Sequence, residues 1–470
     1  MVIYLLNSKV TDIKNITKKN LPYIITWILY YAWVIVFTTW WTASPLTDEV
    51  YGTDSRVILH SLNLLSSAIV VFFMKKEWFK KFALGGGFLI IVNSILFAIS
   101  KDPSFISPNA HSIITVILAC SLGIVNAGIL VPFVYVMNNT EKFYSVVGTN
   151  LLISVLVLLQ EMEVLNISNG FIFSFIMLVL SLIPIFFFKV KDYKQEEITH
   201  EKYMVKTPKI LYITLILNCL YVIFCKGVGK SFLLLANQTV DFNLGIVFYI
   251  GGIIGCVIYY LIYHFFKRSN HMTWNVAFST FALSMFLYYI ADTFILKCIF
   301  AFFVGIGSTI GMINMYYILG VIGRMYWNHS YVKASIFFIG ACGGASGTLL
   351  GNHLTLSNDA NLSMIFAIVS LAIVLVVLML SPTLTLTYFQ DRWEENSTKG
   401  QVDMRNIRKF EKYNLTEREI EVVNCLLNNY TNRQIAITLN ISENTVKHHC
   451  KNIFKKLDIY SKNEISQKLR

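Results

Sequence analysis

The sequence predicts an all-α protein: a twelve-helix transmembrane bundle of six plus six helices, followed by a small four-helix domain that contains a helix-turn-helix. Three observations predict this fold. Of the 470 residues, 55% are hydrophobic and 14% are charged, whereas soluble proteins carry about 25% charged residues. Apolar runs of roughly 20 residues, the length that crosses the hydrocarbon of a bilayer, recur along residues 21–380. Four helix-start signals then follow one another within residues 411–470.

The apolar runs fall into two halves, residues 21–188 and 210–380, separated by a polar segment. We expect twelve spans near residues 21–41, 57–74, 82–100, 112–137, 144–160, 171–188, 210–235, 242–266, 274–293, 295–321, 332–351 and 362–380. An even number of spans places both chain ends on one side of the membrane.

Lys and Arg gather in the connections expected on one side, namely 75–81, 189–209 and 267–268, while the opposite connections 44–55, 161–170 and 351–361 contain none. Because basic loops remain in the cytoplasm, this asymmetry predicts cytoplasmic N- and C-termini. Residues 1–20 are also basic, and they form either a helix on the membrane surface or an unstructured tail.

Six spans, a long polar connection and six further spans resemble the major facilitator architecture. That resemblance implies two related halves around a cavity at the midplane. The facilitator signature of Gly, Asp and Arg is absent from residues 74–82, which read MKKEWFKKF. This departure counts against active transport.

Two lysines stand out within the seventh span. Lys226 and Lys230 lie one helical turn apart, and an ionisable residue inside a span is by default a candidate functional residue. We take them as candidate ligands for an anionic group of a small molecule. The alternative is that the span ends near Cys225 and both side chains reach the outer interface.

The membrane region ends at Ser381-Pro382, and residues 381–410 are expected to form a cytoplasmic linker. Helix caps then mark the last domain, residues 411–470. Thr416 with Glu419, Thr431 with Gln434, and Ser461 with Glu464 each have the spacing of a capping box, and Ser442 caps a further helix.

A helix near residues 432–439, a short turn and the cap at Ser442 have the spacing of a helix-turn-helix, whose second helix enters the major groove of DNA. On that second helix the helical repeat predicts a buried face, made of Val446, Cys450, Ile453 and Leu457. Thr445 and Lys447 occupy its first turns, where base edges are reached. Lys451, Lys455 and Lys456 lie further along, where phosphates are the expected partners.

The motifs Leu415-Thr416-x-Arg418-Glu419, Asn432-x-x-Ile435-Ala436 and Ile441-Ser442-x-x-Thr445-Val446-Lys447-x-His449 resemble the LuxR-type DNA-binding domain of bacterial transcription regulators. The resemblance implies that Thr445, Val446, Lys447, His449 and Lys451 face DNA; Asn432, Ser442 and Lys455 complete the predicted DNA-binding set. It also implies that the last helix, 461–469, mediates dimerisation, with Ile465 and Leu469 as candidate contacts.

These expectations together predict a membrane-bound bacterial transcription regulator in the inner membrane, which senses a small molecule and binds operator DNA as a homodimer. Its expected partners are double-stranded DNA, membrane lipid and an unknown small ligand. One alternative is a facilitator-type transporter with a regulatory DNA-binding tail; another is a DNA-binding module on an inert anchor. Because no catalytic or metal-binding constellation stands out, we expect neither an enzyme nor a cofactor.

Overall fold

A computed structural model describes residues 16–40, 55–100, 107–165, 167–201, 211–221, 227–265, 270–290, 293–327, 329–340, 415–427, 442–459 and 464–468, together with single positions between them. All regular structure in these residues is helical, which confirms the all-α fold. The chain divides into two compact units, Met1–Gln390 and Asp391–Arg470.

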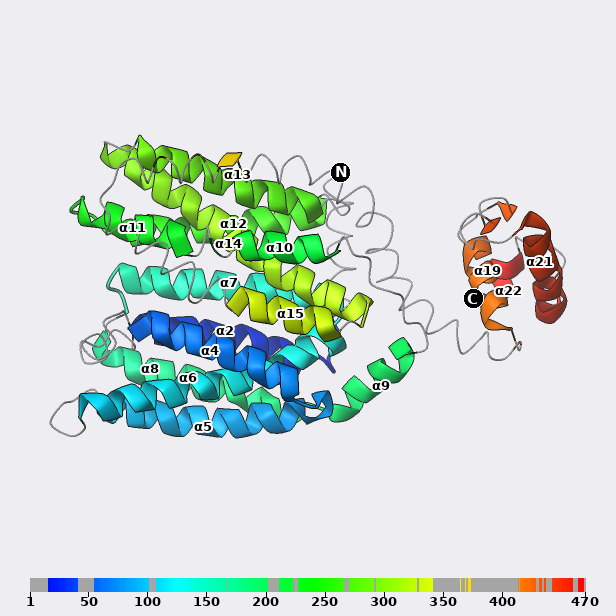
Figure 1. The fold of residues 1–470 in the computed structure, drawn as a ribbon, viewed down its shortest axis with the longest axis horizontal. Coiled ribbons are helices and arrows are strands. Elements are labelled where there is room, and N and C mark those ends of the chain that lie inside the picture. Colours follow the sequence, from blue (N-terminus) through cyan, green and yellow to red (C-terminus); the bar gives the residue numbers. More distant parts are fainter. Residues whose placement is uncertain are drawn as a thin grey trace. The chain divides into compact units, whose positions relative to one another are not determined.

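The helices of the first unit run alongside one another as a bundle (Figure 1). Its first half contains α2 (Leu21–Trp40), α4 (Ser55–Phe73), α5 (Phe79–Ser100), α6 (Pro108–Val131), α7 (Asn139–Glu161) and α8 (Ile167–Leu182). Its second half contains α10 (Leu211–Tyr221), α11 (Gly229–Gln238), α12 (Leu244–Phe265), α13 (Asn270–Tyr289), α14 (Phe294–Met325) and α15 (His329–Gly340). Each expected span up to 332–351 therefore contains a helix, whereas 362–380 lies almost wholly outside the described residues.

The bundle has the surface of a membrane protein. Five of the described helices are each long and apolar enough to cross a bilayer, and Ile172–Phe187 with Val190–Glu197 form a bent sixth candidate. Large apolar side chains point outward along the bundle, for example Phe73, Phe88 and Ile295, each more than 65% exposed. Such a surface is stable against lipid but not against water.

Three spans are less regular than the sequence predicts. α6 continues as a π-helical turn, Pro132–Val136, because proline lacks the N–H of a regular helical bond. α8 continues as a 3-10 helix, Ile183–Phe187, and then bends by 57° into α9 (Val190–Glu201), where the sequence predicted a loop. The seventh span contains α10 and α11, and π-helical residues Gly227 and Val228 precede α11.

Among the described helices, the two halves meet where α7 packs against α12 and α14, and where α4 packs against α15. One end of the bundle carries Lys75, Lys76, Lys80 and Lys81, and we call it the lysine-rich end. The turns that connect α4 with α5, α6 with α7 and α14 with α15 lie together there.

Two glycines set the spacing between α12 and α14. A Cβ placed on Gly305 would overlap the carbonyl oxygen of Phe248, and one placed on Gly251 would overlap that of Phe302. The backbones therefore touch directly, as expected for small residues between membrane helices. Gly343, Gly347 and Gly351, which also recur at helical spacing, lie outside the described residues.

The second unit is built around its own apolar core. Its helices are α19 (Glu417–Leu427), α21 (Glu443–Leu457) and α22 (Ile465–Lys468). Val422, Val423 and Leu426 of α19 pack with the buried face of α21, and Ile435, Ala436 and Ile459 complete the core. This independent core allows residues 391–470 to be studied as a fragment.

Gly305→Ala should destabilise the bundle by about 1–3 kcal/mol, because the added methyl group forces α12 and α14 apart. Thermal unfolding of the purified protein measures the effect. Gly85→Ala is the matched control, since a Cβ on Gly85 meets nothing within 4 Å. Equal melting temperatures for the two variants would contradict the close approach of α12 and α14.

Candidate nucleic-acid interface and its membrane partner

Helix caps fix the start of both long helices in the second unit. Ser442 Oγ accepts a hydrogen bond from the Thr445 backbone N–H at 3.0 Å. At the start of α19, Glu419 accepts from the Thr416 N–H at 2.7 Å, and Thr416 Oγ1 accepts from the Glu419 N–H at 3.3 Å. These two predicted caps are confirmed. Gln434 and Ser461, which belong to the other two, lie outside the described residues.

α21 has one buried face and one exposed face. Val446, Cys450, Ile453 and Leu457 are buried, as the helical repeat predicts. Thr445, Lys447, Lys451 and Lys455 are exposed, and so is Ser442 just before the helix. The exposed face therefore presents three ammonium groups that no described residue pairs with, beside the cap hydroxyl of Ser442, which is bonded to Thr445.

Val446 and His449 of this helix are less exposed than expected for residues predicted to face DNA. Val446 was assigned to the DNA-facing set, but its side chain is 0% exposed. It belongs to the core, and its contribution is to hold α21 in place. His448 is exposed between Lys447 and Lys451, whereas His449 is half-buried. The helical repeat alone would have identified both, since Val446 lies among the apolar positions and His448 lies opposite them.

Lys456 has a structural role that the sequence did not reveal. Its ammonium lies 2.7 Å from Glu419 Oε2, and the Glu419 side chain is only 5% exposed. Burial by itself raises the pKa of Glu419, but the hydrogen bonds from Lys456 and Thr416 outweigh it and hold the pKa below its usual range. The pair thus ties the end of α21 to the start of α19, although the Lys456 side chain itself remains about one-third exposed.

The remaining predicted residues are placed as follows. Asn432 is half-buried before the buried Ile435. Ile465, proposed as a dimer contact, is 1% exposed and packs inside the core of its own unit. An apolar side chain on a terminal helix can serve either the core or a partner, and here it serves the core. Leu469 lies outside the described residues.

The membrane lysines are only partly described. Lys226 lies outside the described residues. Lys230 is exposed at the second position of α11, which continues to Gln238. Since each helical residue rises about 1.5 Å, the rest of α11 adds roughly 12 Å beyond Lys230. That distance disfavours the alternative in which the seventh span ends near Cys225.

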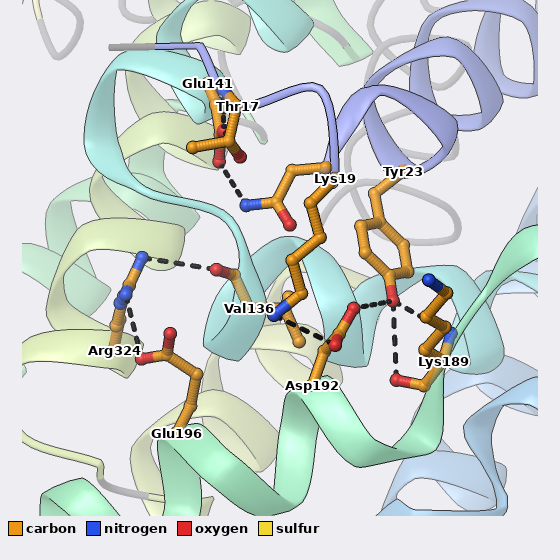
Figure 2. A network of polar contacts seen from close by, with 10 residues as sticks. Thr17, Lys19, Tyr23, Val136, Glu141, Lys189, Asp192, Glu196 and Arg324 are labelled. Carbon is orange, nitrogen blue, oxygen red and sulfur yellow. Dashed lines mark hydrogen bonds and ion pairs between the residues drawn. The ribbon is translucent and has the colours of Figure 1, made fainter.

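A buried carboxylate organises the lysine-rich end. Glu141 is 0% exposed and accepts from Thr17 Oγ1 at 2.8 Å, Asn20 Nδ2 at 2.7 Å and the Asn138 N–H at 2.9 Å (Figure 2). It thereby joins the start of α2 to the start of α7. The sequence reading missed this site, although Asn138 and Glu141 have the spacing of a capping box.

Next to Glu141, the side chains of Lys142 and Arg324 connect the two halves of the bundle. The Lys142 side chain is buried and donates to Val134 O at 2.8 Å in the first half and to Gly320 O at 2.7 Å in the second. Arg324 of α14 donates to Met137 O at 2.5 Å and pairs with Glu196 of α9 at 2.9 Å. Every charge in this contact has a partner, which a dry interface requires.

α9 is fastened at a second point. Asp192 accepts from Tyr23 Oη at 3.2 Å and pairs with Lys19 at 2.9 Å (Figure 2). α9 therefore carries Asp192, held by the start of α2 in the first half, and Glu196, held by Arg324 in the second. A movement of one half relative to the other must break or carry along these bonds.

Comparison with known proteins supports the division into two parts. Residues 413–469 match the family described as bacterial regulatory proteins, luxR family. The nitrate/nitrite response regulator protein NarP of Escherichia coli (strain K12) is 50% identical over 48 residues, which are 10% of this chain and 22% of that protein. SgaR of Hyphomicrobium methylovorum, a probable transcriptional regulatory protein, is 45% identical over 58 residues, which are 12% of this chain and 26% of that protein. The chain thus spans about a quarter of the length of these relatives.

The first unit is similar to solved transporters in fold. The E. coli fucose:proton symporter FucP matches with a TM-score of 0.52 and 13% identity over 78% of this chain and 99% of that chain. The human organic anion transporter MFSD10 matches with a TM-score of 0.53 and 12% identity over 77% and 100%. The chain therefore joins a multi-pass region of major facilitator fold to a LuxR-type helix-turn-helix domain, as the sequence predicted.

Lys447→Ala in the fragment 391–470 should weaken operator binding by about 1–3 kcal/mol and relax base preference at one position, because the first turns of the helix reach base edges. Lys455→Ala should weaken binding to all sequences alike and lower the salt dependence by roughly one unit of slope. Fluorescence anisotropy with operator and scrambled duplexes separates the two effects. An equal loss on every duplex for Lys447→Ala would contradict its role in reading bases.

Glu419→Gln should lower the unfolding free energy of the fragment by about 1 kcal/mol at neutral pH, because it removes the charge that holds Lys456. The folded pKa of Glu419 lies below the ordinary value of about 4.3, so this stabilisation is present above that pH and is lost as pH falls through the folded pKa. Denaturant titrations from pH 7 to pH 3 measure it. Glu421→Gln, which breaks the exposed pair with Arg418, is the control and should cost less.

Proposed function

We propose that this protein is a membrane-bound transcription regulator. In this proposal the membrane bundle responds to a small molecule, and the tethered domain binds operator DNA as a dimer in the cytoplasm of a bacterial cell. The observation that carries the proposal is the exposed face of α21, with Thr445, Lys447, His448 and Lys451, in a domain of a family of transcription regulators.

The exposed residues of α21 have different roles in this proposal. Lys447 and His448 read base edges in the major groove, because both are exposed near the start of the helix. Lys451 and Lys455 contact phosphates further along. Val446, which is buried, does not contact DNA bases in this proposal. The dimer contact is assigned to the last helix with Leu469 as the remaining candidate, since Ile465 is used by the core.

The cytoplasmic location of the DNA-binding domain rests on charge. The basic connections that the structure describes, 75–81 and 189–201, lie at one end of the bundle, and basic loops stay inside the cell. An even number of spans would bring the chain out of its last expected span on the same side. DNA and the domain that reads it are then in the same compartment of a cell whose inner membrane holds the bundle.

Control by a ligand requires two arrangements of the bundle with unequal affinity for it, because a ligand that binds both equally shifts nothing. The contacts at the lysine-rich end provide one such arrangement, in which Lys142 and Arg324 hold the halves together. We infer that a ligand near Lys226 and Lys230 changes the balance between this arrangement and an opened one. The two arrangements differ in how readily two tethered domains meet on an operator.

A facilitator-type transporter with a regulatory tail is the second candidate, and the fold of the first unit favours it. The absent loop signature at residues 74–82 counts against it. Uptake of the ligand into proteoliposomes separates the two candidates: a regulator binds its ligand without accumulating it.

The proposal predicts that Lys226→Ala and Lys230→Ala change the transcripts controlled by the protein but leave DNA binding by the fragment 391–470 unaltered. Transcript profiling of cells with the intact chain, the variants and a deletion measures this. Lys297→Ala is the matched control, since this lysine is also in a membrane helix and donates to Thr239 at 2.8 Å. Transcripts that follow deletion but ignore both lysine variants would contradict the ligand role and retain the DNA-binding role.

A further inference from the structure

A small hollow at the lysine-rich end lies where the two halves meet, between α4, α6 and α15. Most of its lining surface is apolar, with valine, leucine and methionine side chains. Lys76, Tyr135, His329 and Lys333 also line it. Lys76 belongs to the first half and Lys333 to the second, so the hollow is shared between halves.

Two lysines bring positive charge to the hollow, and both Lys76 and His329 experience the positive charge of Lys333. Two acidic residues lie nearby. Glu77 pairs with Lys194 at 3.0 Å, and Glu197, which accepts from Tyr193 at 2.9 Å, offsets part of the positive charge at Lys76. Within the described part of the chain, no hydrogen bond or ion pair involves the Lys76 ammonium.

Donors remain for a ligand. Lys333 donates to Phe72 O at 2.9 Å, which uses one of the three N–H groups of its ammonium. Tyr135 Oη and His329 Nδ1 lie 2.7 Å apart, and no residue that the structure describes forms a hydrogen bond with the second ring nitrogen of His329. Because the bond between Tyr135 and His329 uses the proton of one partner, this pair offers one further donor. Together with the two ammonium groups it can bind an anion that has several acceptor oxygens.

The surface beside the hollow is apolar and faces outward. Phe72 and Phe73 at the end of α4 are 60% and 79% exposed, and Phe337 of α15 is 51% exposed. Lys333 also lies over the Phe72 ring, 4.5 Å from its centroid. A group bound here thus has cationic partners on one side and a lipid-facing surface on the other, as at the level of phospholipid head groups.

We propose that Lys76, Tyr135, His329 and Lys333 form a site for the phosphate of an anionic phospholipid head group, whose acyl chains follow the outward phenylalanines. Without an anion, Lys76 and Lys333 repel each other across the contact between α4 and α15. A bound phosphate removes this repulsion and favours the packed arrangement of the lysine-rich end. This inference does not depend on what the DNA-binding domain recognises.

The test uses the full-length protein in detergent, with three additions: phosphatidylglycerol, phosphatidylcholine and inorganic phosphate. Native mass spectrometry counts the retained lipid, and thermal unfolding measures the protection. Wild-type protein should retain more phosphatidylglycerol than phosphatidylcholine. It should also be stabilised more by phosphatidylglycerol than by phosphatidylcholine or inorganic phosphate. The double substitution Lys76→Gln with Lys333→Gln should weaken this binding at least about tenfold, the factor expected for one charge-assisted hydrogen bond.

Two controls keep the result interpretable. Lys75→Gln with Lys81→Gln removes the same charge from exposed lysines at the same end, and it should leave lipid retention unchanged. The single substitution Lys76→Gln keeps the hydrogen bond from Lys333 to Phe72. It therefore replaces the double variant in this test if the double variant fails to fold. Equal losses in both double variants, or equal retention of phosphatidylcholine, would overturn the site. Equal protection by inorganic phosphate would overturn the lipid as its ligand.

Discussion

The buried amine of Lys142 is the contact on which the closed lysine-rich end depends. It reaches backbone carbonyls of both halves, Val134 and Gly320, from a position with no exposure to solvent. Leaving such a group without a partner in a dry interior costs several kcal/mol. Any rearrangement of the bundle must therefore offer Lys142 new acceptors or admit water to it. This makes separation of the halves at this end a change between distinct states rather than a gradual one.

In the second unit, the orientation of α21 depends on contacts with the rest of the domain. α21 can present cations to DNA only because its opposite face is committed to the core and its two ends are fixed. Ser442 fixes its beginning, and the bond from Lys456 to Glu419 fixes its last turn. The lysines of α21 therefore have different roles. Lys456 stabilises the domain, whereas Lys447, Lys451 and Lys455 remain available to bind a polyanion.

Periodic features were predictable from the sequence, and contacts between distant segments were not. Apolar runs located the helices of the bundle, and the caps at Thr416 and Ser442 located α19 and α21. The attachment of α9 and the bonds from Thr17 and Asn20 to Glu141 join residues more than a hundred positions apart. Val446 and Ile465 illustrate a different limit: a family resemblance assigned them to surfaces, whereas packing placed both in the core.

We propose that a DNA-reading helix is tethered to the cytoplasmic face of a membrane bundle, and binding of labelled operator duplex to sealed membrane vesicles of known orientation can decide this. Inverted vesicles, with the cytoplasmic face outward, should bind the duplex, and right-side-out vesicles should bind it only after they are opened. Binding by intact right-side-out vesicles, or by neither preparation, would show that the helix is not held at the cytoplasmic face.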